Sequence, residues 1–387
     1  DSTNGIILID IWKRGGDRTN ANWTILGKPG VGKSNAIKKI LANEWSQGSK
    51  IIVIDPEREF KHLCKKLNGS WIDAGGGSRG RINPLQVREV PLDDEDEDDP
   101  LYSKDLVEKG SLALHIHFLR TFFKIYFKGI SEVQLAALEE LIEELYVTDF
   151  RIPWNVDPKT VPNDKWPIME DLYNKVVKAS EKEPEYFKDL SKLMRRISKG
   201  ADSGIWNGHT SVDLNNDFVV FDTNALVNAD ENLQRAQYFN ILSFSWNIIS
   251  IDRLMQVLLG LDEGYLIADP EIPEALKFLR NISKRIRKYM GGLMFITHNT
   301  VDLNNERLRA FGQALLDNPC FKLIFGLGEN DLDALTKIMK LSEAEFDMLS
   351  KGQRQHALLV AGSKRVHAII EDNTDFERDL FGKGGGV

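Results

Sequence analysis

The sequence predicts an α/β fold, with a largely parallel central sheet that is flanked by helices and interrupted by an all-α insertion. Short runs rich in Val, Ile and Leu lack polar alternation, which is typical of strands covered on both faces of a parallel sheet. Strand and helix patterns alternate at both ends of the chain, as they do in α/β domains. The middle, roughly 101–200, has helical periodicity and almost no candidate strands.

The first 90 residues begin this alternation. The expected strands are 5–12, 23–26, 51–55 and 71–73, and the expected helices are 33–47 and 58–67. The run 51–55 reads Ile-Ile-Val-Ile-Asp, so we expect it to be buried on both faces. We interpret residues 1–90 as the first part of the sheet domain.

An acidic linker and an all-helical insertion are expected over 91–210. Seven consecutive acidic residues, 93–99, lie between Pro91 and Pro100. The segment 131–146 places leucine and isoleucine on one face and glutamate on the other, the pattern of an amphipathic helix. Two further helices are expected, at 169–182 and 185–199. The acidic run is either a solvated linker or a functional loop, and its composition favours the linker.

The alternation resumes over 211–387, which we interpret as the second part of the sheet domain. The expected strands are 218–222, 256–261, 293–297 and 320–325, and the expected helices are 233–253, 272–290 and 303–316. Two late runs, 356–360 and 365–370, flank the sequence Ala-Gly-Ser-Lys and predict a β-hairpin.

Composition excludes several classes of protein. Of 387 residues, 42% are hydrophobic and 28% are charged, the balance of an ordinary globular protein. The formal charge is −8, and the acidic run accounts for almost all of it, so the chain lacks the basic footprint of a dedicated duplex-DNA binder. Two cysteines, Cys64 and Cys320, are too few for a disulfide framework. No apolar run reaches the ~18 residues that a membrane span needs.

The chain begins Asp-Ser-Thr, with neither an initiator methionine nor a basic-then-apolar leader. We therefore expect it to be part of a longer protein.

A phosphate-binding loop follows the expected strand 23–26. Residues 27–34 read Gly-Lys-Pro-Gly-Val-Gly-Lys-Ser, the full P-loop pattern, and a helix is expected directly after it. Backbone N–H groups of such a loop wrap a polyphosphate at the positive end of the helix dipole. Lys33 is expected to reach the β and γ phosphates, and Ser34 to ligate Mg²⁺. The predicted nucleotide-binding residues are Gly27, Pro29, Gly30, Val31, Gly32, Lys33, Ser34 and Asn35.

Two acidic residues end the apolar strand 256–261. Asp262 is expected to hold the metal, and Glu263 to activate the attacking water as general base. The alternative is a buried strand that ends in an acidic surface turn, and the P-loop elsewhere in the chain favours the catalytic interpretation.

His298 follows the strand 293–297, at the edge of the sheet where parallel strands place their ligands. It is a candidate γ-phosphate sensor, and a helix cap or a satisfied buried histidine explains it nearly as well. His115 and His117 lie two apart on an expected helix, so they point to different faces and make no metal site.

The order of these motifs resembles a known family. The chain contains GKPGVGKS, IIVIDPEREF, GRINPLQV, a helical insertion, LLGLDEGYLI and FITHN. This series resembles the type IV secretion and conjugative transfer ATPases of the VirB-four, TraC and TrbE kind, in the HerA/FtsK-related branch of RecA-like motors. The resemblance covers essentially the whole chain, and it implies the C-terminal motor domain of a protein with an additional N-terminal domain.

The resemblance implies a RecA-like P-loop fold, ATP and Mg²⁺ as cofactors, and a hexameric full-length protein. It matches Lys33, Ser34, Asp262 and Glu263 to the family's phosphate, metal and catalytic residues, and it places His298 where relatives usually have Gln. A neighbouring subunit is expected to donate an arginine finger. Arg354 and Arg365 are the candidates, and each could instead be an ordinary surface arginine.

The leading functional hypothesis is a Mg-dependent ATPase that energises pilus assembly or substrate translocation in a type IV secretion or conjugation machinery. Its expected place is the cytoplasmic face of the bacterial inner membrane, as a peripheral protein among other secretion components. One alternative is a DNA-translocating motor of the same superfamily, although charge does not indicate DNA. Another is a nucleotide-gated scaffold without useful turnover, against which the presence of Glu263 argues.

Overall fold

The computed structural model describes residues 5–76, 80–91, 104–212, 216–298, 306 and 308–382. Two compact units make up the chain. The first unit comprises Asp1–Val53, Glu59–Gly69 and Asp252–Val387, and the second comprises Ile54–Arg58 and Ser70–Ile251. The acidic run 93–99 lies outside the described residues.

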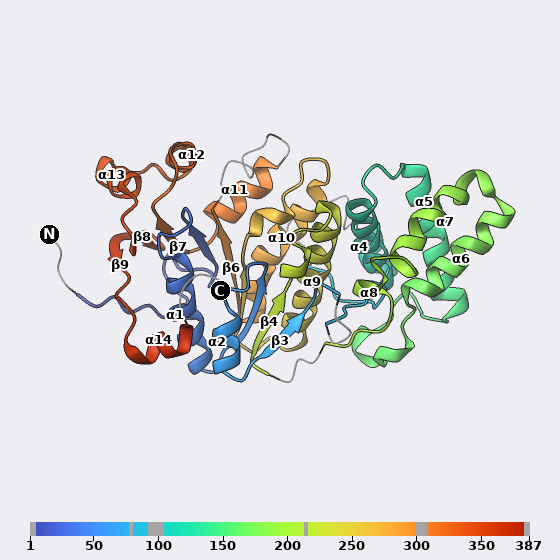
Figure 1. The fold of residues 1–387 in the computed structure, drawn as a ribbon, viewed down its shortest axis with the longest axis horizontal. Helices are drawn as coiled ribbons and strands as arrows, with labels where there is room; N and C mark the ends of the chain where they lie inside the picture. The colour runs from blue at the N-terminus through green and yellow to red at the C-terminus, as the bar shows by residue number, and fades with distance from the viewer. Residues whose placement is uncertain are drawn as a thin grey trace. The chain divides into compact units, whose positions relative to one another are not determined.

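The first unit is built on a mostly parallel sheet (Figure 1). Its strands are β1 (Trp23–Leu26), β2 (Lys50–Asp55), β5 (Val257–Leu261), β6 (Gly291–Thr297), β7 (Phe321–Phe325), β8 (His356–Ala361) and β9 (Lys364–Ile369), of which β2 ends just beyond the unit's boundary. Their order is β2-β5-β6-β1-β7-β8-β9. The pairs β5–β6, β6–β1 and β1–β7 are parallel, whereas β7–β8 and β8–β9 are antiparallel. The α/β class and the parallel sheet predicted from the sequence are therefore confirmed.

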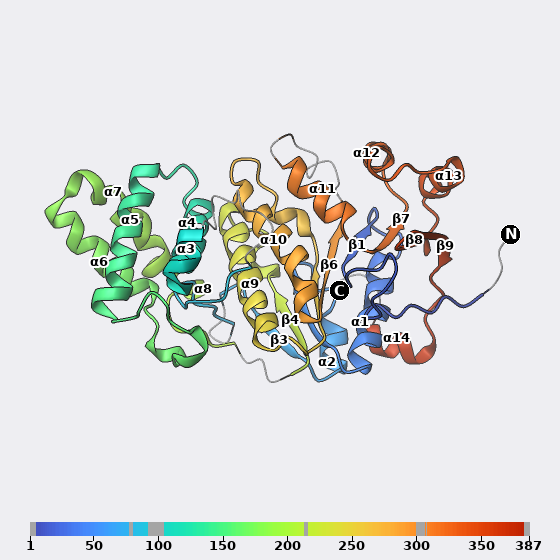
Figure 2. The same cartoon turned by 180° about the vertical axis from the view of Figure 1, so that it is seen from behind.

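The helices of the first unit follow the strands along the chain. They are α1 (Lys33–Ser46), α2 (Lys61–Lys66), α10 (Pro273–Arg285), α11 (Arg309–Asp317), α12 (Glu329–Met339), α13 (Glu343–Lys351) and α14 (Asp375–Phe381). Two views show α12 and α13 at one end of the β8–β9 hairpin and α14 at the other (Figures 1 and 2). The expected helix 303–316 begins, as far as the described residues show, with α11.

The apolar runs predicted as strands of the parallel sheet are buried, as expected for a sheet that is covered on both faces. Every residue of β1, β5 and β6 is buried. The late hairpin is also confirmed. Strands β8 and β9 pair from His356↔Ile369 to Ala361↔Lys364, and Gly362 in the turn between them has a φ of 62°.

The expected strand 5–12 is wrong. These residues form no strand, and Ile6 and Leu8 are 90% and 91% exposed. The run pairs with no described strand, and β1, the next strand along the chain, has β6 on one side and β7 on the other. An apolar run alone cannot specify a strand, because it does not reveal whether the segment pairs with another strand.

The second unit contains two parallel strands and a helical region. The strands are β3 (Ser70–Asp73) and β4 (Phe218–Asp222). The helices are α3 (Lys104–Lys109), α4 (Ser111–Tyr126), α5 (Glu132–Glu144), α6 (Met169–Lys182), α7 (Pro184–Ser198), α8 (Ser203–Trp206) and α9 (Glu231–Ile251). Within this unit α4 packs on α9 and α6 packs on α7, and the teal to light-green helices gather together in Figure 2.

Buried polar side chains fix the segment that the sequence marked as GRINPLQV. The Asn83 side chain donates to the Pro167 carbonyl oxygen at 2.8 Å and accepts from Leu85 N–H at 3.0 Å. Arg88 is 1% exposed and donates to the side-chain and backbone oxygens of Asn240. Burial lowers the pKa of Arg88 to about 9. Because unpaired buried polar groups are costly, this network holds 83–88 in one conformation.

Candidate active site

The P-loop connects β1 to α1, as the sequence predicts. Gly27 has φ 159°, and a Cβ built on it would lie 2.7 Å from Cβ of Phe325, so a larger residue would collide with the end of β7. Gly32 caps α1 with φ 103° in the left-handed region, which strains any residue with a side chain. A side chain is therefore excluded at Gly27 by contact with Phe325 and disfavoured at Gly32 by backbone geometry.

Neighbouring segments hold the loop at both ends. The Lys28 N–H donates to the Gly326 carbonyl oxygen at 2.9 Å, and the Gln355 N–H donates to the Val31 carbonyl oxygen at 2.8 Å. Lys33 Nζ donates to the Gly27 carbonyl oxygen at 2.5 Å, so the ammonium group lies across the loop. Pro29 and Gly30 are exposed, whereas Val31 is buried beneath the loop.

Strand order brings the acidic pair to the same edge as the loop. The order β5-β6-β1 places the ends of these three parallel strands side by side. Leu26, directly before the loop, pairs in register with Thr297, and Leu261, directly before Asp262, pairs with Phe295. Asp262, His298 and the start of the P-loop consequently follow three adjacent strands at nearly the same level.

The backbone at Glu263 is strained. Its φ of 51° and ψ of 47° lie in the left-handed region, which a residue with a long side chain seldom adopts. Such conformations cost about 1–3 kcal/mol and cluster at functional sites. Asp262 is 7% exposed, and its Oδ1 accepts from the Glu263 N–H at 3.2 Å. The turn therefore fixes both carboxylates at the end of β5.

His298 contacts the predicted general base. Its Nδ1 lies 3.1 Å from Oε1 and 2.9 Å from Oε2 of Glu263. The Tyr265 ring meets the imidazole edge-on, with 5.1 Å between the ring centroids. The structure thus brings His298 to Glu263, the water-activating candidate, and the contact gives His298 a way to orient that carboxylate.

The two arginine candidates differ in their surroundings. Arg365 donates to the Met339 carbonyl oxygen at 2.7 Å and pairs with Glu345 at 3.3 Å, so it ties β9 to α12 and α13. Arg354 is exposed and directly precedes Gln355, whose N–H contacts the P-loop.

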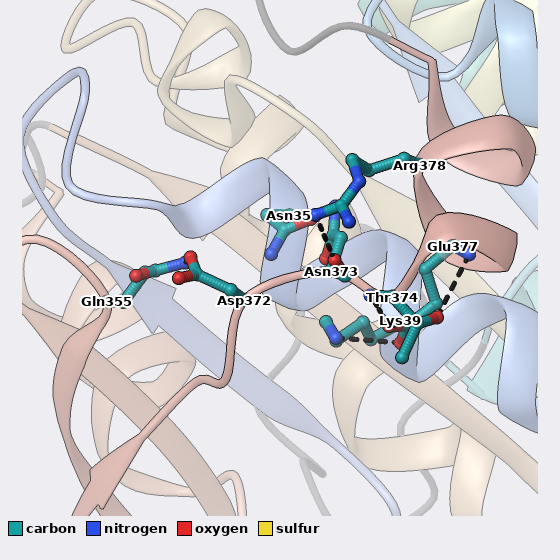
Figure 3. A network of polar contacts seen from close by, with 8 residues as sticks. All are labelled: Asn35, Lys39, Gln355, Asp372, Asn373, Thr374, Glu377 and Arg378. Atoms are coloured by element: carbon teal, nitrogen blue, oxygen red, sulfur yellow. Dashed lines mark hydrogen bonds and ion pairs between the residues drawn. The ribbon is translucent and has the colours of Figure 1, made fainter.

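A second group of residues beside the P-loop was missed by the sequence interpretation. Asn373 donates to the side chain of Asn35 at 2.8 Å, and Gln355 donates to Asp372 at 2.9 Å (Figure 3). Thr374 caps α14 in a capping box with Glu377. The Thr-x-x-Glu spacing is a recognisable start signal for a helix, so α14 could have been predicted, but not the surface that it covers.

The residues at this edge suit Mg²⁺ bound with a nucleotide. The Ser34 hydroxyl and the Asp262 carboxylate are hard oxygen donors, the type that Mg²⁺ prefers. Within the described residues no group of three or more His, Cys, Asp or Glu side chains could hold a metal. A P-loop does not need one, because Mg²⁺ there takes one or two protein ligands together with phosphate oxygens and water.

Comparison with known proteins decides the family. The family model described as the TraG P-loop domain matches residues 5–357. The chain belongs to this family. The solved structure of VirB4 of Thermoanaerobacter pseudethanolicus is 48% identical, covers 97% of this chain and 96% of that one, and has a TM-score of 0.90. The predicted resemblance to type IV secretion and conjugation ATPases is confirmed, as are the RecA-like P-loop fold and the ATPase class.

More distant relatives resemble this chain in fold, or in sequence over part of their own length. The plasmid coupling protein TrwB in complex with a non-hydrolysable ATP analogue is 12% identical, covers 91% of this chain and 86% of that one, and has a TM-score of 0.55. An uncharacterised protein of Bacillus anthracis is 22% identical over 436 residues, and protein TraC of Escherichia coli (strain K12) is 20% identical over 332 residues. These matches cover 99% and 83% of this chain but span only 64% and 34% of those two proteins.

Proposed function

We propose that this domain binds ATP with Mg²⁺ and hydrolyses it to drive a type IV secretion or conjugation machinery. The observation that carries the proposal is the strand order β5-β6-β1, which lines up Asp262-Glu263, His298 and the P-loop at one edge of the sheet. A phosphate-binding loop at the same sheet edge as two carboxylates, with one strand between them, supplies the groups that phosphoanhydride hydrolysis uses.

In the proposed mechanism the P-loop N–H groups cradle the phosphates, and Lys33 neutralises charge on the β and γ groups. Ser34 and Asp262 would hold Mg²⁺, which when bound neutralises charge that develops on the phosphate oxygens. Glu263 orients a water molecule in line with the γ phosphorus and accepts its proton as the new P–O bond forms, while the bond from the γ phosphorus to the β–γ bridging oxygen breaks and ADP leaves. His298 holds the Glu263 carboxylate in the orientation that this proton transfer needs. The products are ADP and inorganic phosphate.

The proposed assembly is a ring of six copies in the full-length protein, docked on secretion components at the cytoplasmic face of the inner membrane. Among the described residues no helix is long and apolar enough to cross a bilayer. We also propose domain boundaries at 90 and 210, with the helical insertion, about 101–200, carrying partner contacts rather than chemistry.

A DNA-translocating motor is the second candidate, and the ATPase response of the full-length protein separates the two. We would measure phosphate release alone, with linear duplex DNA, and with the purified secretion components. Stimulation by the components supports the leading proposal, whereas stimulation by DNA alone supports the DNA motor. Absence of hydrolysis under all three conditions would favour a nucleotide-gated scaffold.

Replacement of His298 tests its proposed link to Glu263. We expect His298→Ala to lower kcat, by up to about a hundredfold, because a catalytic group that loses its orientation by about an ångström loses that much rate. The Kd for ATP should stay within about twofold, since the phosphates do not depend on this contact. His298→Gln keeps a donor at the same place and should recover much of the rate. Equal loss in both variants would contradict the orienting role.

The arginine-finger proposal concerns the neighbouring subunit. Because the finger supplies positive charge in the transition state, turnover per subunit should rise with protein concentration. We rank Arg354 above Arg365, because Arg365 already holds Met339 and Glu345. Arg354→Ala should remove the rise and spare ATP binding. Hydrolysis by isolated monomers at a rate independent of concentration would refute a finger in trans.

A further inference from the structure

Gln355 and the segment 370–374, which leads into α14, lie beside the P-loop. Gln355 has a left-handed φ of 66°, and its N–H donates to the Val31 carbonyl oxygen at 2.8 Å. A Cβ built on Gly32 would lie 3.4 Å from Cγ of Gln355, in van der Waals contact. The side chain of Gln355 is thus held against the last glycine of the loop.

Asp372 lies between Gln355, its hydrogen-bond partner, and Asn373, its chain neighbour, and each of these two residues contacts the phosphate-binding segment. On one side Gln355 Nε2 donates to Asp372 Oδ1 at 2.9 Å. On the other, the adjacent Asn373 donates to Asn35 Oδ1 at 2.8 Å, on the first turn of α1 (Figure 3). The Asp372 carboxylate is therefore held close to the loop without belonging to it.

The segment that carries Asp372 is fixed at both ends. Before it, the Ile370 N–H donates to the Gln355 carbonyl oxygen at 2.8 Å. After it, Thr374 caps α14, and Glu377 of that helix pairs with Lys39 of α1 at 2.7 Å. Figure 3 shows Asn373, Thr374 and Glu377 beside Asn35 and Lys39 of α1. A carboxylate positioned this way is preorganised, so little ordering entropy is lost when it binds a ligand.

The direction of a bound nucleotide follows from the loop. The P-loop lysine reaches the β and γ phosphates, whereas backbone N–H groups cradle the α and β phosphates. The α phosphate must therefore lie toward Ser34 and Asn35, and the nucleoside must leave the loop at that end, where Asn373 touches Asn35. The first group beyond the α phosphate is the ribose.

A carboxylate at this position can bind only a hydrogen-bond donor of the nucleotide. Ionised Asp accepts hydrogen bonds and donates none, so Asp372 repels phosphate oxygens and attracts hydroxyl groups. One bond from Gln355 leaves acceptor capacity, because a carboxylate offers about four lone-pair sites. Carboxylates bind ribose hydroxyls in this way in dinucleotide-binding folds.

We propose that Asp372 accepts a hydrogen bond from a ribose hydroxyl of the bound nucleotide, and that Gln355 orients it for this purpose. The proposal rests on the P-loop as the nucleotide site and adds a determinant of specificity for the sugar. It makes the site selective for ribonucleotides over deoxyribonucleotides.

Isothermal titration calorimetry with unhydrolysed ligands tests this. We would compare ADP, 2′-deoxyADP, 3′-deoxyADP, purine riboside diphosphate and inorganic pyrophosphate, each with Mg²⁺. The unaltered domain should bind ADP roughly tenfold more tightly than at least one deoxy analogue, the ratio expected for one hydrogen bond to a charged acceptor. Asp372→Ala should bind ADP and both deoxy analogues equally, with unchanged affinity for pyrophosphate.

Matched controls separate the possible failures. Asp375→Ala removes a nearby carboxylate that is 98% exposed, and it should keep the discrimination. Discrimination that persists in Asp372→Ala overturns the proposal, as does a loss of pyrophosphate affinity, which would indicate a structural role. If Asp372→Ala instead changes the preference for ADP over purine riboside diphosphate, the residue reads the base. Failure of the unaltered domain to bind pyrophosphate or ADP would refute the nucleotide site itself.

Discussion

Glu263→Gln is expected to bind ATP and Mg²⁺ normally and to hydrolyse ATP roughly two to four orders of magnitude more slowly. The amide keeps the size and shape of the side chain but cannot accept the proton of the attacking water. The strained turn should be unaffected, because Gln adopts the left-handed conformation no less readily than Glu at φ 51°. Binding is measured by calorimetry, and turnover by phosphate release from the assembled full-length protein.

The matched control for this variant is Glu329→Gln, the same change at an exposed position in the first turn of α12. It should leave turnover within about twofold, as most exposed substitutions do. Normal hydrolysis by Glu263→Gln would remove Glu263 from the role of general base. Loss of ATP binding would instead show that this carboxylate helps to hold the metal.

Much of this site could be predicted because its signals are local. The P-loop requires glycines at fixed spacing, and a strand before and a helix after it confirm the motif. Asp262-Glu263 follows an apolar run, and carboxyl ends of parallel strands gather at one edge of a sheet. The structure adds the register, with Leu26 opposite Thr297, which depends on pairing between residues about 270 positions apart. No local pattern specifies such a pairing.

The side-chain contacts of the site could not be predicted from the sequence. The contact of His298 with Glu263 depends on the left-handed backbone at Glu263, which nothing in Leu-Asp-Glu-Gly indicates. The position of Asp372 depends on where α14 docks, although the Thr374–Glu377 capping box was visible. The one wrong strand, 5–12, failed for the related reason that an apolar run does not reveal whether a partner strand is available.

Lys33→Ala is expected to reduce hydrolysis at least about a hundredfold and to weaken ATP binding strongly, while the domain stays folded. The ammonium group is the positive charge placed for the β and γ phosphates, and its contact with the Gly27 carbonyl oxygen places it across the loop rather than in the core. Gly27 and Gly32 hold the loop's shape through their own backbone angles, so the change should leave the thermal midpoint nearly unaltered.

Lys337→Ala, which removes the same charge from an exposed position of α12, is the control for a general effect of charge. The two lysine variants should differ in pyrophosphate affinity, because only Lys33 is expected to contact phosphate. They should not differ in the ratio of ADP to deoxyADP affinity, because that ratio depends on the sugar. Unchanged turnover in Lys33→Ala would refute the phosphate site, because the proposed mechanism assigns Lys33 to neutralise charge on the β and γ phosphates.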